Sequence, residues 1–186
     1  MIAPLSSVVF RLALIAAGAF AVAAPARGAE TFAGEDRDFR VPPQAELKQP
    51  PYHGPTPMEA PGAKTILTAD LKRLVEGGAR PVLVDVLAGE HPLTVPGAVW
   101  MPEAGHGTAV GDAMQAPFAA RLAKLTAGDP ERPLVFFCLS AECWLSYNAS
   151  LRALAAGHRQ VYWYRGGIAA WRQAKLPLAP LPPATR

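Results

Sequence analysis

Two cysteines, the only ones in the chain, are the residues with the clearest capacity for chemistry. Cys138 and Cys143 lie in the stretch FFCLSAECWLSYN and are separated by four residues. Such a pair can form a structural disulfide, ligate a metal, or act as a nucleophile with a second thiol that resolves its products. Zinc needs four ligands, and with His106 as a third ligand no fourth candidate lies nearby, so we expect no metal.

The cysteines follow the most hydrophobic segment of the chain, PLVFFC (133–138), which is expected to be a strand that ends on Cys138. A helix is expected to follow from 144 to 156, where Gly157 stops it. Backbone N–H groups of the connecting turn favour an anion at the strand end. We therefore expect them to favour the ionised form of Cys138 and to hold a terminal persulfide, with Ser140 as a hydroxyl donor.

Apolar runs elsewhere in the sequence alternate with segments whose apolar residues recur at helical spacing. Strands are predicted at 65–67, 81–86, 97–102, 133–138 and 161–164, and helices are predicted to begin near 68, 114, 144 and 168. Thr68 is expected to cap the first helix. This alternation predicts an α/β fold, a parallel sheet with helices on both faces, whose binding site lies at the carboxyl ends of the strands.

The N-terminal segment has the layout of a secretory signal. Arg11 precedes an apolar run, 12–24, and the small residues Ala24-Pro25-Ala26 suit a cleavage site. The run is too short to span a bilayer, which takes about 20 residues, so an uncleaved anchor is the weaker alternative. We therefore expect residues 1–26 to be a signal peptide. The mature protein is expected to be periplasmic or secreted and to have no membrane span. An exported protein can form disulfides.

Three segments follow the signal. Residues 27–63 are rich in proline and charge, so they form an extended arm that either wraps the domain or tethers it. Residues 64–180 are expected to form one domain, and 181–186 a tail. Of the 18 basic residues, Arg11 lies in the signal, which leaves 17 against 15 acidic residues. This balance predicts no nucleic acid as partner.

Several stretches together resemble a single-domain rhodanese, a sulfurtransferase fold in which a six-residue loop begins with the nucleophilic cysteine and cradles its persulfide. They are LVDV (83–86), VPGAVWMP (95–102), RPLVFFC (132–138), CLSAEC (138–143) and YRGGIAAWRQAKLPL (164–178). The resemblance implies the rhodanese-like fold over about 64–178, no cofactor, and a sulfur donor or thiol acceptor, small molecule or protein, as partner. It also implies that Cys138 is the nucleophile, with the cradle formed by Leu139, Ser140, Ala141, Glu142 and Cys143.

The sequence departs from the common rhodanese pattern at the loop itself. Active members commonly place an arginine at the last loop position, which here is Cys143, and Glu142 adds a negative charge that should repel a dianion such as thiosulfate. The usual Asp-x-Arg after the second strand is replaced by Asp-Val-Leu (85–87), and a usual histidine by Thr94. We therefore expect neutral or protein-bound sulfur donors.

A narrower resemblance involves PGAVWMP, LTAGDPERPLVFFC, VYWY and the Cys-Trp at 143–144 with Ser146 and Asn148. These are similar to exported rhodanese-like proteins that accompany pyrroloquinoline-quinone-dependent alcohol oxidation, a group noted for a Cys-x-x-Cys-Trp signature. The present chain has Cys-x-x-x-x-Cys-Trp. The resemblance implies a setting, with a periplasmic quinoprotein dehydrogenase or its cytochrome as partner.

Four residues outside the cysteine pair have their own interpretations. His106, in a glycine-rich loop, is either a proton acceptor for the thiol or a solvated loop histidine. Arg165 either supplies the positive charge missing from the cradle or lies on the surface. Asp85 is expected to hydrogen-bond loop backbone. Trp144 is expected to screen the loop from water.

Three functional hypotheses remain open at this point. In the first, Cys138 carries a sulfane sulfur or is oxidised, and Cys143 resolves it. In the second, the domain is a non-catalytic binding module stapled by a Cys138–Cys143 disulfide. In the third, the pair is a thiol-disulfide oxidoreductase. Cys138 as a plain buried thiol and Cys143 as filler are the chemically silent alternatives.

Overall fold

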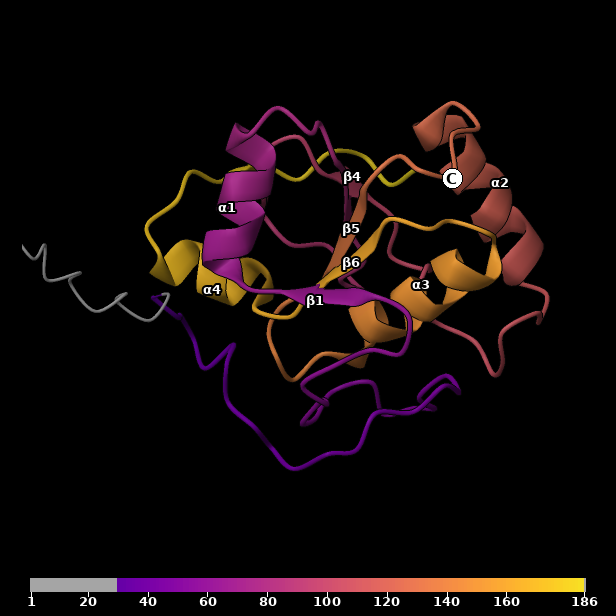
Figure 1. Ribbon diagram of the computed structural model, residues 1–186, viewed down its shortest axis with the longest axis horizontal. Helices are drawn as coiled ribbons and strands as arrows, with labels where there is room; N and C mark the ends of the chain where they lie inside the picture. The colour runs from indigo at the N-terminus through magenta and orange to yellow at the C-terminus, as the bar shows by residue number, and fades with distance from the viewer. Residues whose placement is uncertain (1–29, 186) are drawn as a thin grey trace, which may run out of the picture.

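The computed structural model describes residues 30–185 (Figure 1). The expected signal peptide, 1–26, lies outside these residues. Across the part of the chain that is described, no helix has the length and apolar character needed to cross a membrane.

A five-stranded parallel sheet forms the centre of the domain, with the order β1-β6-β5-β2-β4. The strands are β1 (Lys64–Ile66), β2 (Val82–Asp85), β4 (Val99–Trp100), β5 (Leu134–Phe137) and β6 (Val161–Tyr164). β2, β5 and β6 are buried along most of their length. This burial explains why each of them appears in the sequence as a near-continuous apolar run. Asp85 pairs with Phe137, and Phe137 with Tyr164, so these three strands end in one row.

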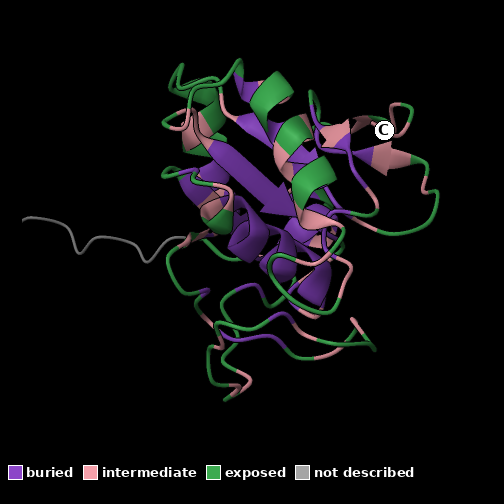
Figure 2. Ribbon diagram, turned by 90° about the vertical axis from the view of Figure 1, so that its right-hand side faces the viewer, coloured by how far each residue is buried: buried purple, intermediate pink, exposed green. Residues whose placement is uncertain are grey.

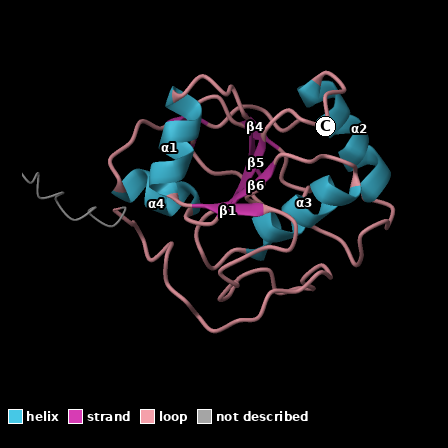
Figure 3. Ribbon diagram, viewed as in Figure 1, coloured by secondary structure: helices cyan, strands magenta, loops and turns pink. Residues whose placement is uncertain are grey.

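Four helices cover the two faces of the sheet (Figure 3). α2 (Gln115–Thr126) and α3 (Trp144–Ala155) pack on the face that carries Val84 and Phe136. α1 (Thr68–Glu76) and α4 (Gly167–Gln173) pack on the face that carries Phe137. The α/β architecture predicted from the alternation of strands and helices is confirmed.

A second sheet that the sequence did not predict joins the C-terminal tail to the domain. β3 (Leu93–Thr94) pairs antiparallel with β7 (Ala179–Pro180). Farther along, the N–H of Thr185 donates to the carbonyl of Trp100 at 2.8 Å. The described part of the tail therefore packs along β4.

The proline-rich arm, residues 30–63, runs across the domain without forming a helix and lies below the sheet in Figure 2. It packs against α3 and β6 through a third apolar cluster, formed by Leu47, Ala60, Trp144, Tyr147, Leu151 and Trp163. Of the two alternatives left open by the sequence, wrapping and tethering, the described residues adopt the wrapped one.

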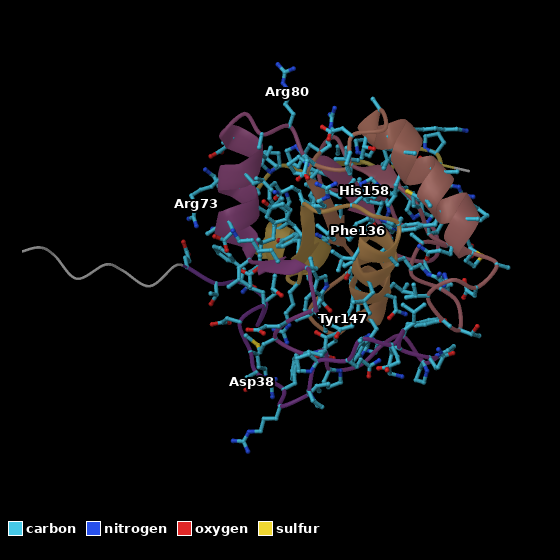
Figure 4. The ribbon with its side chains drawn as sticks, turned by 45° about the vertical axis from the view of Figure 1, so that its right-hand side comes forward. Asp38, Arg73, Arg80, Phe136, Tyr147 and His158 are labelled. Carbon is cyan, nitrogen blue, oxygen red and sulfur yellow. A yellow bond between two sulfur atoms is a disulfide. The ribbon has the colours of Figure 1, made fainter. Side chains whose placement is uncertain are left out.

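The arm makes α3 a buried helix. Every residue from Trp144 to Ala153 is buried, whereas an ordinary surface helix keeps one polar face in water. The hydroxyl of Tyr147 accepts from the N–H of Gln44 at 2.8 Å and donates to its carbonyl at 2.7 Å. The carboxamide of Asn148 pairs with the N–H and carbonyl of Lys48 at 2.9 and 3.0 Å. The arm thus supplies the partners that buried polar groups require, and Tyr147 points towards it (Figure 4).

Candidate functional site

A disulfide closes the loop between β5 and α3. It joins Cys138, the residue after β5, to Cys143, which caps α3, with 6.1 Å between the two Cα atoms. This separation lies within the usual range for disulfides. Cys138 is 1% exposed and Cys143 is 7% exposed. The interpretations of Cys138 as a plain thiol and of Cys143 as filler do not hold, because the two sulfurs are bonded to each other.

The start of the loop is held by α4. The carbonyl of Cys138 accepts from the N–H of Ile168 at 3.0 Å, and that of Leu139 from the N–H of Ala169 at 2.9 Å. Gly167 adopts φ of +60°, and a Cβ at this position would collide with the carbonyl oxygen of Cys138. A glycine is therefore required for the loop and the helix to approach this closely.

The end of the loop is held by the arm. The hydroxyl of Thr56 donates to the carbonyl of Ala141 at 2.7 Å, and the N–H of Gly54 donates to the carbonyl of Glu142 at 2.8 Å. Tyr52 accepts from the N–H of Trp144 at 2.9 Å, which satisfies a donor at the first turn of α3.

The indole of Trp144 is buried against the same segment. Its N–H donates to the carbonyl of Pro55 at 3.1 Å, and its ring meets Tyr147 edge to face with 5.0 Å between centroids. The side chain therefore lies between α3 and the arm. The arm and Trp144 together cover this side of the loop.

Ser140 organises the interior of the loop. Its carbonyl accepts from the N–H of Cys143 at 3.1 Å, and its hydroxyl oxygen accepts from the N–H of Glu142 at 3.3 Å. The N–H groups of Leu139, Ser140 and Ala141 have no hydrogen-bond acceptor among residues 30–185. No loop residue has a positive φ, so the loop closes without a left-handed position. Leu139, at 44% exposure, marks the open edge of the cradle.

Arg165 is buried, so its interpretation as a surface arginine is wrong. Its guanidinium donates to the carbonyls of Glu35 at 2.6 Å, Pro57 at 2.8 Å, Arg37 at 2.9 Å and Thr56 at 3.1 Å, and to the Thr56 hydroxyl at 3.3 Å. Burial lowers the pKa of Arg165, while nearby acidic groups, Asp38 first, raise it. All these hydrogen bonds of Arg165 go to the arm. Among the described residues, the guanidinium is linked to the loop only indirectly, through Thr56, whose hydroxyl donates to Ala141.

His106 approaches the loop only indirectly. Its ring meets Tyr52 edge to face with 5.1 Å between centroids, and Tyr52 packs on the cluster that contains Cys143. Its Nδ1 lies 3.8 Å from Glu103, and its carbonyl accepts from Arg152 at 2.7 Å. Within the described chain it makes no hydrogen bond to either cysteine, so the alternative in which it accepts a proton from the thiol has no geometric support.

The segment that carries His106 is fixed by an ion pair. Arg152 of α3, fully buried, donates to Asp112 at 2.8 Å. This bond holds the pKa of Asp112 well below its usual range. The ion pair thereby binds the glycine-rich loop to α3 and holds the loop in place.

Asp85 ends β2, beside the start of the loop, and is fully buried. One carboxylate oxygen accepts from the N–H of Leu87 at 2.9 Å, which confirms the expected bond to loop backbone. The other accepts from the hydroxyl of Thr94 at 2.6 Å and lies 2.8 Å from Nε2 of His91. Thr94, at the position where the family often has a histidine, therefore donates a hydrogen bond to the buried carboxylate of Asp85.

No signal in the sequence pointed to the arm residues that meet the loop. Tyr52, His53 and Thr56 lie in a segment without periodic pattern, and their partners are mainly backbone groups. His53 pairs with Cys143 in an isolated antiparallel bridge. Its Nε2 lies 3.9 Å from the carboxylate of Glu142. In residues 30–185 no group of three or more histidine, cysteine or acidic side chains could hold a metal.

Comparison with solved structures gives low identities over the domain. The thiosulfate sulfurtransferase of Pseudomonas aeruginosa is 20% identical, with 63% of this chain and 20% of that chain covered and a TM-score of 0.46. The rhodanese-like domain of an Anabaena sp. protein is 19% identical, with 66% and 86% covered and a TM-score of 0.45. A variant of EanB in complex with hercynine is 17% identical, with 64% and 32% covered and a TM-score of 0.50. The chain thus spans only a fifth and about a third of the first and last of these.

No curated protein matches the chain. The model of the rhodanese-like domain family matches residues 67–174, which is more than half of the chain. The match contains the four helices, the whole disulfide loop and every strand of the main sheet other than β1, which lies just before it. The chain belongs to the rhodanese-like domain family.

Proposed function

We propose that the protein carries sulfur and exchanges disulfides, with Cys138 as the nucleophile and Cys143 as the resolving cysteine. The observation that carries this proposal is the disulfide between the first and last residues of the loop at the end of β5. Membership of the rhodanese-like family supports a sulfur donor or thiol acceptor as the reaction partner. A nucleophile with a bonded second thiol can alternate between open and closed states.

Hydrosulfide can open the closed loop without any further reductant. Its sulfur attacks Sγ of Cys138, the bond to Cys143 breaks, and the electron pair leaves on Sγ of Cys143. The products are a persulfide on Cys138 and a thiolate on Cys143. An acceptor thiolate then takes the outer sulfur and leaves a thiolate on Cys138, or Cys143 attacks Sγ of Cys138, releases hydrosulfide and restores the disulfide.

The charges around the loop favour a neutral or protein-bound sulfur donor over the dianion thiosulfate. The guanidinium of Arg165 is engaged by the arm, and the carboxylate of Glu142 lies at the loop. A dianion would meet the negative charge without a matching cation. The N–H groups of Leu139, Ser140 and Ala141, which have no acceptor among the described residues, are available for one anionic sulfur.

A second function has its own observation. The arm bonds to Ala141, Glu142 and Trp144 while the disulfide is closed, and Cys138 is almost fully buried. This arrangement also suits a binding module in which the disulfide is a permanent staple. Its partner would be a quinoprotein dehydrogenase or its cytochrome, as the narrower sequence resemblance implies.

We place either function in the periplasm or outside the cell, after removal of residues 1–26. The disulfide supports this location, since disulfides persist mainly in oxidising compartments. The test is the intact mass of protein recovered from the periplasmic fraction, which should correspond to a chain that lacks residues 1–26. A full-length chain in the cytosolic fraction would contradict this location.

The functional test is intact mass of the purified protein before and after treatment with hydrosulfide, thiosulfate, mercaptopyruvate or a polysulfide. Sulfur carriage predicts that hydrosulfide adds one sulfur and two hydrogens to the oxidised protein, a gain that is absent from Cys138→Ser. In Cys143→Ser, which has no disulfide for hydrosulfide to open, a polysulfide supplies the outer sulfur instead, and the persulfide should persist longer because no second thiol resolves it. Reversible reduction by a dithiol with no sulfur gain would indicate a pure oxidoreductase. A disulfide that only strong reductant opens, in a Cys138→Ser variant that still binds its partner, would indicate the staple.

A further inference from the structure

The geometry points to His53 as the residue that stabilises Cys143 as a thiolate when the disulfide opens. This inference rests on the proposed function, because it concerns the open state of the same pair. His53 lies in the arm, outside the segment that matches the family model. It would therefore be an addition of this chain to the family's loop.

The register of the arm places His53 directly opposite Cys143. The N–H of Gly54 donates to Glu142 at 2.8 Å, and the N–H of Trp144 donates to Tyr52 at 2.9 Å. These two bonds flank His53 and Cys143, which makes them a non-hydrogen-bonded antiparallel pair. In such a pair the Cα atoms are about 4.5 Å apart and the two side chains extend from the same side.

The imidazole is not tied to another group of the described chain. It is 77% exposed, and within residues 30–185 it makes no hydrogen bond. Its nearest charged neighbour is Glu142, at 3.9 Å, which is longer than a hydrogen bond. Its position is set by backbone bonds of the neighbouring residues, so the side chain can turn between Glu142 and Cys143.

The other titratable groups near this point come from two elements. Glu142 belongs to the loop and its carboxylate opposes a thiolate at Cys143. His106 and Glu103 belong to the loop before α2 and lie behind the ring of Tyr52. His53 is therefore the residue opposite Cys143 that can carry a positive charge, and when it is protonated its charge and that of Glu142 act in opposite directions.

The chemical consequence follows from the opening step. When a thiolate or hydrosulfide bonds to Cys138, the electron pair of the broken bond goes to Cys143. A protonated imidazole opposite this sulfur stabilises the anion, or gives it a proton and becomes neutral.

The test uses Cys138→Ser, in which Cys143 is the only thiol. The rate of alkylation and the ultraviolet absorbance of the thiolate are measured from pH 5 to 9, with His53 intact and with His53→Gln. The thiolate fraction should be about fivefold lower in His53→Gln, the size of effect expected for the loss of one nearby unit charge in water. His53→Lys, which carries a positive charge at this position, should retain the high thiolate fraction.

Glu142→Gln provides the matched opposite, with an expected rise in the thiolate fraction of similar size. Circular dichroism of each variant checks that the arm and domain are folded. Coinciding titrations of the parent and His53→Gln would overturn the role of His53. That outcome would leave the sulfur-transfer proposal intact, since the latter is judged by the mass gain on Cys138 in the unmodified protein.

Discussion

The two ends of the Cys138–Cys143 loop are held by different parts of the chain. At the first end, α4 donates backbone N–H groups to the carbonyls of Cys138 and Leu139. At the other end, Thr56 and its neighbours in the arm bind the carbonyls of Ala141 and Glu142. The first set lies within the segment that the family model matches, and the second lies outside it.

The difference separates what builds the loop from what covers it. The α4 contacts join regular elements that share one hydrophobic cluster, so they open only when the domain unfolds. The arm has no helix, and much of its attachment is by hydrogen bonds. Segments of this kind open locally at lower free energy than the core. The arm is therefore the side through which the disulfide should become accessible.

The largest expected effect is at the α4 end. Gly167→Ala should reduce the free energy of unfolding by about 3 kcal/mol, because the new methyl group meets the carbonyl of Cys138 and the backbone is left-handed. Denaturant unfolding measures the loss. Gly157→Ala is the matched control, since Gly157 is also left-handed but has open space around it. Equal losses in the two variants would show that the close approach of Gly167 to Cys138 does not contribute to the free energy of unfolding.

A smaller effect is expected at the arm end. Thr56→Val removes the hydroxyl that donates to Ala141 and accepts from Arg165, at a cost of about 1 to 2 kcal/mol. We expect the disulfide to be reduced severalfold faster by dithiothreitol, measured by thiol release. The control is Thr65→Val, because the hydroxyl of Thr65 is buried and has no partner within the described chain. Similar reduction rates in both variants would mean that the arm does not protect the disulfide.

The smallest effect concerns the far anchor of the arm, where buried Glu35 accepts from the N–H and hydroxyl of Thr68, both at 2.8 Å. Burial raises the pKa of Glu35, and the Thr68 bonds only partly offset it. The protonated carboxyl is thus favoured in the folded state. Its contribution to stability is full below the ordinary pKa of 4.5 and is lost as the pH rises through the higher folded value.

Unfolding of the parent and of Glu35→Gln between pH 4 and 8 measures this contribution. The parent should lose stability relative to the variant as the pH rises above 4.5, because glutamine does not titrate. Hydrogen exchange should accelerate most in the arm, and exchange in β5 should change only as far as the global free energy of unfolding does. A stability difference that is the same at every pH would contradict the assignment to Glu35.

The sequence predicted the frame of the site because its signals are local. The run 133–138 contains a buried strand followed by Cys138, and the helix expected at 144–156 begins at Trp144 as predicted. Thr68 illustrates the limit of such signals. It was expected to cap α1, but Leu67 is the cap residue, and the Thr68 hydroxyl binds Glu35 and Tyr164 instead.

The course of the arm could not be predicted, because its contacts are set by tertiary structure. Arg165 binds carbonyl groups, which every residue carries, so the sequence does not identify them. A weak signal existed in α3, where Tyr147 and Asn148 interrupt a helix that is otherwise rich in small and apolar residues. Polar side chains on a covered helix require partners, and only the fold showed that these are Gln44 and Lys48.

The long reach of the arm sets an order of events during synthesis. Gln44 and Tyr147 are 103 residues apart, and Thr56 and Arg165 are 109 residues apart. The arm leaves the ribosome well before its partners are made, and contacts this distant in sequence form slowly. We therefore expect Cys138 and Cys143 to meet the oxidant that joins them before the arm covers them. The arm would then preserve whichever state the pair had reached when the chain finished folding.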